Sequence, residues 1–245
     1  SGPVPLNNAP WLLPPLESLM RMRQNHPMSK SGEIWDIPLR LFHWLLMVSV
    51  IASIGSVKAG NMFVHEKAGI SVAALLIFRV IWGFAGNRHA RFAHFLTGPG
   101  RVIAYIKSRM GGERGIHPGH APTGGWATMV ILMVFAGMAS MGLMAHDDVL
   151  YEGPLAAWAG DFTDTATRLH HLGEKLVFAV IAMHLLAMLV YRFWLKINLV
   201  PAMLHGGRDE VRQPSSKTRQ IAGVMVLAAV LITAHALGMS GERFY

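Results

Sequence analysis

The sequence contains no cysteine and few charged residues. None of its 245 residues is Cys, and only 15% are Asp, Glu, Lys or Arg, against about a quarter in a typical soluble domain. The lack of Cys excludes disulfides, thiolate catalysis, iron–sulfur clusters and Cys-based zinc sites, so the 13 histidines must carry any metal. The lack of charge, with a mean hydropathy of +0.37, indicates a membrane protein. No phosphate loop or HExxH motif favours phosphoryl transfer or hydrolysis.

The sequence contains five apolar runs, each about as long as a helix needs to be to cross a bilayer. They cover about Leu39–Val57, Glu66–Ala85, Trp126–Ala145, Leu169–Trp194 and Ile221–Leu237. We therefore predict an all-α integral membrane protein. Residues 1–35, with six prolines, form a separate N-terminal segment, 36–207 hold four spans, and 208–245 hold a basic linker and a fifth C-terminal transmembrane helix.

The connections between the runs differ in charge, which predicts their side of the membrane. Residues 87–125 and 192–219 are rich in Lys and Arg, whereas 147–168 hold five acids and a single Arg. Since Lys and Arg are retained on the cytoplasmic side, the basic connections and the N-terminus are predicted to be cytoplasmic and the C-terminus to lie outside. This pattern explains the net charge of +8 without nucleic acid.

Four histidines fall within or at the entry of the first, second and fourth runs, where an ionisable side chain is costly. They are His43, His65, His170 and His184; His235 in the fifth run is a weaker candidate. Packing through hydrogen bonds would account for any one of them. His170 and His184, however, are 14 residues apart, which puts them on nearly one helix face and about 21 Å apart along the axis.

The first run enters the membrane from the cytoplasm and the second from the outside, so the four imidazoles fall at two levels. His65 joins His170 at an outer level, and His43 joins His184 at an inner level. Two imidazoles facing each other, with no Cys and no intramembrane acid, suit the axial ligation of a heme iron better than a zinc or di-iron site. His170 is favoured over its neighbour His171, which would point about 140° away from His184.

Other residues near the two levels fit a porphyrin. Gly55, Gly69 and Gly173 would let a flat macrocycle approach the backbone, although Gly is also common in membrane helices for packing alone. Arg79 follows His65 by 14 residues, which places it at the inner level. It either pairs with a heme propionate or reaches to the cytoplasmic headgroups.

The motifs resemble those of the prokaryotic cytochrome b561 family, which includes b-type cytochrome subunits of nickel–iron hydrogenases. The likeness covers about residues 34–207, with the stretches IWDIPLRLFHW, HEKAGISVAALLIFRVIWGFAG, ARFAHF, GHAPTGG, HHLGEKLVFAVIAMH and LVPAMLHGG in the same order and spacing. The resemblance implies a four-helix bundle in the bacterial inner membrane that binds two b hemes through the four histidines. It also implies electron transfer between a periplasmic redox partner and the quinone pool.

Three functional hypotheses remain open. The first is an electron-transfer subunit that connects a periplasmic cytochrome c or dehydrogenase with ubiquinone or menaquinone. The second is a self-sufficient superoxide:quinone oxidoreductase, so the sequence alone leaves open whether the chain is an enzyme. The third is a heme-free membrane anchor whose histidines only pack.

Overall fold

The computed structural model describes residues 35–110, 122–146, 151–206 and 216–241. These residues are mostly helical and include no sheet; the only bridge among them joins His146 and Glu152. The predicted all-α class is therefore confirmed. The proline-rich segment, most of the GHAPTGG stretch, part of the acidic connection and most of the basic linker lie outside the described residues.

All five predicted membrane spans are present as helices long and apolar enough to cross a bilayer. They are α2 (Ile37–Lys58), α3 (Met62–Ala85), α6 (Pro122–Met144), α8 (Thr163–Leu189) and α10 (Lys217–Gly241). The last four begin about one turn or more before the predicted runs. Hydropathy marks where a helix enters hydrocarbon, whereas the helix itself can begin earlier, among more polar residues. In α3, for example, Asn61 Oδ1 accepts a hydrogen bond from Val64 N at 3.0 Å.

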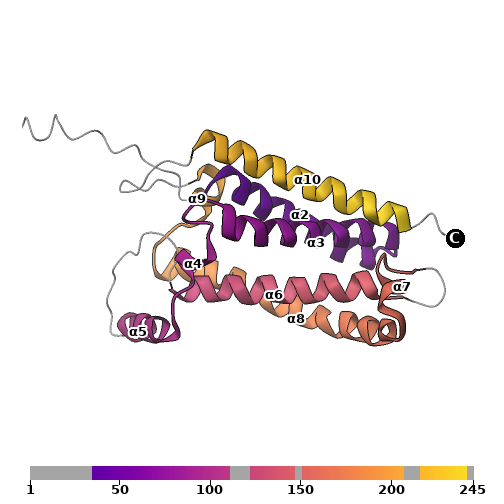
Figure 1. The fold of residues 1–245 in the computed structure, drawn as a ribbon. Helices are drawn as coiled ribbons and strands as arrows, with labels where there is room; N and C mark the ends of the chain where they lie inside the picture. The colour runs from indigo at the N-terminus through magenta and orange to yellow at the C-terminus, as the bar shows by residue number, and fades with distance from the viewer. Residues whose placement is uncertain (1–34, 111–121, 147–150, 207–215, 242–245) are drawn as a thin grey trace, which may run out of the picture.

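Short helices occupy the connections and were not predicted. They are α4 (Phe92–Phe95), α5 (Pro99–Met110), α7 (Ala156–Ala159), a 3₁₀ turn (Gly160–Phe162), a π-helical turn (Val190–Trp194) that ends α8, and α9 (Val200–His205). Figure 1 shows α4, α5 and α9 at the end of the bundle where α2 begins, and α7 at the opposite end. The basic connections are thus gathered at one end, away from α7.

The long helices form two layers (Figure 1). Helices α2, α3 and α10 lie together in one layer, and α6 pairs with α8 in the other. Helix α3 is the central element because it packs against α2, α6 and α10. Phe78 on α3 is fully buried between Phe42 of α2 and the stacked ring of Trp82.

A buried carboxylate ties the start of α2 to the end of α3. Asp36 caps α2 by accepting a hydrogen bond from Leu39 N at 3.0 Å. Its other oxygen accepts from Trp82 Nε1 at 3.1 Å and from Asn87 Nδ2 at 2.7 Å. Three donors offset the cost of burying this charge. The cluster therefore fixes where α2 and α3 sit relative to each other at the inner end.

Candidate functional site

The outer pair of predicted histidines meets between the two layers. His65, in the first turns of α3, and His170, near the start of α8, have ring centroids 5.9 Å apart and planes inclined by 79°. Both side chains are half-buried. Residues more than 100 positions apart in the sequence are thus brought into one site, as the two-level arrangement predicted.

Each ring of this pair is held by its Nδ1 atom. His65 Nδ1 lies 3.0 Å from the carbonyl oxygen of Ser53 on α2, and His170 Nδ1 lies 3.0 Å from that of Met138 on α6. Since a carbonyl only accepts, both hydrogen bonds form in the tautomer that carries the proton on Nδ1, which leaves the Nε2 lone pair available for a metal. The hydroxyl Oγ of Ser53 also lies 3.1 Å from His65 Nδ1 and can accept from it in this tautomer. Metal-binding histidines are commonly oriented by such a hydrogen bond, made by the ring nitrogen that does not bind the metal. Sequence reasoning missed Ser53 and Met138, because a backbone acceptor leaves no pattern in the side chains.

A cavity of about 740 Å³ opens beside the two rings, within the range of cofactor pockets. Its walls come from α2, α3, α6 and α8, and His65, His170 and His171 all line it. We call it the outer cavity. His171 is exposed, and its ring centroid lies 6.3 Å from that of His170. The ring that approaches His65 is that of His170, as the helix geometry predicted.

The glycines around the outer cavity differ from those predicted. Gly69 lines it, and nothing within 4 Å would meet a Cβ there. The expectation for Gly173 was wrong, because its Cβ position faces Met138 Sδ at 2.8 Å, toward α6. Gly55 is exposed and is not part of the cavity wall. No pattern in the sequence singled out Gly142, where a Cβ would lie 2.7 Å from Cε1 of His170.

The two members of the predicted inner pair lie on α2 and α8. His43 on α2 is half-buried, its Nδ1 atom is buried without a hydrogen-bond partner, and its imidazole is within electrostatic range of His184 on α8. His184 is exposed. Helix α8 is continuous from Thr163 to Leu189, so the regular geometry assumed for the two levels holds. The structure therefore shows ring contact for the outer pair, and the pairing of His43 with His184 stays a prediction.

Arg79 is buried at the inner end of α3, with only 4% of its surface exposed. Its Nη1 donates to the Ala90 carbonyl at 3.1 Å, and its guanidinium lies 4.8 Å over the ring of Phe92. The charge of Asp36 is also nearby. Arg79 thus holds the chain that follows α3 against the bundle, whether or not it also serves a cofactor.

The residues present fit heme better than a protein-bound metal ion. Within the described ranges, no group of three or more His, Cys, Asp or Glu could hold a metal ion. Heme needs only two protein ligands, because the porphyrin fills the other positions. Two imidazoles on opposite sides of one iron have centres about 6 Å apart, given a metal–nitrogen bond of about 2 Å. The 5.9 Å between the ring centroids of His65 and His170 agrees with this.

Comparison with known proteins decides the family. The model of the prokaryotic cytochrome b561 family matches residues 34–206. The chain belongs to this family. It is therefore a multi-pass membrane b-type cytochrome of electron transfer, as its resemblance implied. The match includes α2 to α9 and all four candidate ligands and ends before α10.

Two curated relatives of this b-type cytochrome carry the same name, "Probable Ni/Fe-hydrogenase B-type cytochrome subunit". The one from Bradyrhizobium diazoefficiens is 22% identical over 212 residues, which cover 72% of this chain and 85% of the relative. The one from Rhizobium leguminosarum bv. viciae is 30% identical over 81 residues, which cover 25% of this chain and 34% of the relative. No solved structure matches.

Proposed function

We propose that the chain binds two b hemes, one at each level, and passes electrons across the bacterial inner membrane between a periplasmic redox partner and quinone. His65 and His170 would hold the outer heme, and His43 and His184 the inner one. The observation that carries this proposal is the outer pair: two imidazoles 5.9 Å apart, each anchored at Nδ1, beside a cavity of about 740 Å³.

The two levels would place the two hemes near opposite sides of the bilayer. Along α8, His170 and His184 are separated by about 21 Å, most of the thickness of the hydrocarbon core. When bound, heme b supplies a one-electron couple whose potential depends on its ligands and surroundings. At the outer site the carbonyls of Ser53 and Met138 would orient the two imidazoles with Nε2 free to bind, and residues of four helices line the cavity.

The charges at the two ends support the orientation. The connections gathered around α4, α5 and α9 are basic, which favours the cytoplasmic side. The outer level then faces the periplasm. The names of the two relatives support a redox enzyme as the partner on that side, and a periplasmic cytochrome c or dehydrogenase fits this role equally.

The heme count is tested by spectroscopy on purified protein. We expect reduced-minus-oxidised bands of a b-type cytochrome and a pyridine hemochrome assay close to two hemes per chain. The variant His65→Ala should retain one heme and serves as the internal control. Folded, colourless protein would refute the proposal in favour of a heme-free anchor, and one heme in the unmodified chain would refute the two-level assignment.

Quinone and partner are tested separately. In proteoliposomes, reduced protein should be oxidised by an added ubiquinone or menaquinone analogue, without any other protein. Reduction by superoxide alone, at a rate that exceeds that with any periplasmic donor, would instead favour the superoxide:quinone oxidoreductase.

A further inference from the structure

Helix α10 lies outside the part of the chain that matches the family, yet it packs closely along α3 (Figure 1). The residues that face the bundle recur every three or four positions and so form one stripe. They are Gly223, Leu227, Leu231, His235 and Gly238. Leu227 is 3% exposed and belongs to the core of the bundle. Helix α10 is thus part of the packed structure.

Two glycines let α10 approach the bundle at both of its ends. A Cβ at Gly223 would lie 2.5 Å from atoms of both Pro38 and Trp82. A Cβ at Gly238 would lie 2.7 Å from Cδ1 of Ile70 on α3. Small residues at helix interfaces allow such close contact in a membrane, where packing supplies much of the association energy. The contact at Gly238 matters here because Ile70 also lines the outer cavity.

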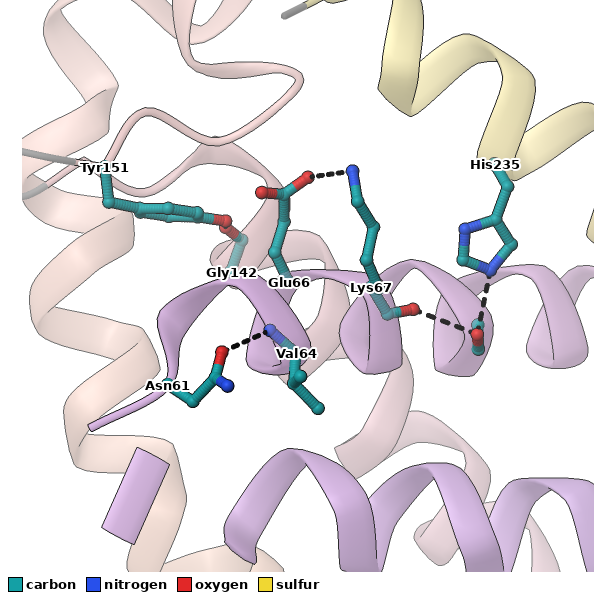
Figure 2. A network of polar contacts seen from close by, with 8 residues as sticks. Asn61, Val64, Glu66, Lys67, Gly142, Tyr151 and His235 are labelled. Carbon is teal, nitrogen blue, oxygen red and sulfur yellow. Dashed lines mark hydrogen bonds and ion pairs between the residues drawn. The ribbon is translucent and has the colours of Figure 1, made fainter. Parts of the chain in front are cut away.

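A hydrogen bond joins α10 to α3 at the same level. His235 Nε2 lies 2.9 Å from Ser71 Oγ, which lies 2.9 Å from the carbonyl oxygen of Lys67 (Figure 2). The single hydroxyl hydrogen of Ser71 goes to the carbonyl, so His235 must donate from Nε2 for both bonds to form. A neutral imidazole makes this bond, so the contact requires no charge within the membrane.

The hydrogen bond holds α3 from the side opposite the outer cavity. On α3 the cavity wall includes His65, Glu66, Gly69 and Ile70, whereas Ser71 is not part of it. One turn before Ser71, Lys67 pairs with Glu66 at 3.2 Å, and Glu66 faces the cavity (Figure 2). The turn of α3 that follows His65 is thus fixed between α10 and the cavity.

We propose that α10 is a positioning helix for the outer heme site and that His235, through Ser71, is its positioning residue. This inference rests on the proposed function. His65 depends on the placement of α3 against α2, because the acceptor of its Nδ1 proton is Ser53 on α2. A shift of α3 changes that hydrogen bond, and such outer contacts set the orientation and basicity of a ligating histidine and hence the potential of its heme.

The test measures the two heme potentials separately in the full-length protein. In His235→Ala and Ser71→Ala, the equilibrium constant for reduction of the outer heme should change by about threefold to tenfold, where tenfold corresponds to 59 mV for one electron. The inner heme should keep its potential. His235→Gln should restore the outer potential, because a Gln side chain places its amide nitrogen as many bonds from Cα as Nε2 of His. Ile232→Ala, on the exposed side of α10, is the matched control.

Selective loss of the outer heme in His235→Ala, rescued by His235→Gln, would also support the inference. Unchanged potentials in both His235→Ala and Ser71→Ala would overturn it, as would an equal shift of both hemes, which indicates a general loosening of the bundle. These results leave the proposed function intact. Absence of heme from the unmodified protein would overturn the proposed function itself.

Discussion

Gly142 offers the most direct test of how the outer site is built. The substitution Gly142→Ala places a methyl group 2.7 Å from Cε1 and 3.0 Å from Nδ1 of His170. Ordinary contact begins near 3.4 Å, so the ring must withdraw by several tenths of an ångström. Its hydrogen bond to the Met138 carbonyl, now 3.0 Å long, would then be strained or broken.

The expected cost follows from these two contacts. Overfilling a packed site costs about 1–3 kcal/mol, and the lost hydrogen bond costs about 0.5–1.5 kcal/mol, which together make about 1.5–4.5 kcal/mol. Without heme, the ring of His170 can turn into the open cavity and avoid the added methyl group. The free-energy cost therefore lowers the affinity for heme. At about 1.4 kcal/mol for each factor of ten, affinity for the outer heme should fall by about 10-fold to 1,600-fold.

The assay is heme content and spectrum after purification in detergent. Gly142→Ala should retain about one heme per chain and keep the inner heme's potential. Gly137→Ala is the control on the same helix, because nothing within 4 Å would meet its added Cβ; it should keep both hemes. Two hemes and an unchanged outer potential in Gly142→Ala would refute the packing argument.

Three further predictions concern the remaining site residues. Because each heme depends on its own pair, His43→Ala should remove the inner heme and spare the outer one, with His65→Ala giving the converse; loss of the same potentiometric component from both variants would contradict the two levels. His171→Ala should keep the outer heme, with at most a shifted potential, since its ring is exposed and the ring of His170 meets His65; heme analysis checks this. Arg79→Leu leaves the Ala90 carbonyl unpaired and should lower the free energy of unfolding by about 1–3 kcal/mol in a denaturation experiment, and heme loss beyond that seen in Phe92→Leu would indicate a propionate contact.

The long helices could be predicted because hydrocarbon thickness imposes their length, and the approach of His170 to His65 because α8 is regular between His170 and His184. Contacts that depend on neighbouring backbones could not. The carbonyls of Ser53 and Met138 that orient the ligands leave no mark on residue type. Gly142 resembles any small residue of a membrane helix, and Gly173 was misplaced because a helical position alone does not tell which of two neighbouring helices it faces. The role of His235 depends on Ser71, which only the packing of α10 reveals.

The double attachment of α2 to α3 has a consequence for the order in which the protein is assembled. Asp36 bonds Trp82 and Asn87 at one end of this hairpin, and Ser53 bonds His65 at the other. All of these residues precede α6 and α8 in the sequence, so the hairpin can close before α6 and α8 are synthesised. If the proposed function holds, the hairpin then presents His43 and His65 as two half-sites, neither of which can be completed until α8 is inserted. Heme insertion is therefore expected to follow the arrival of the second half of the bundle.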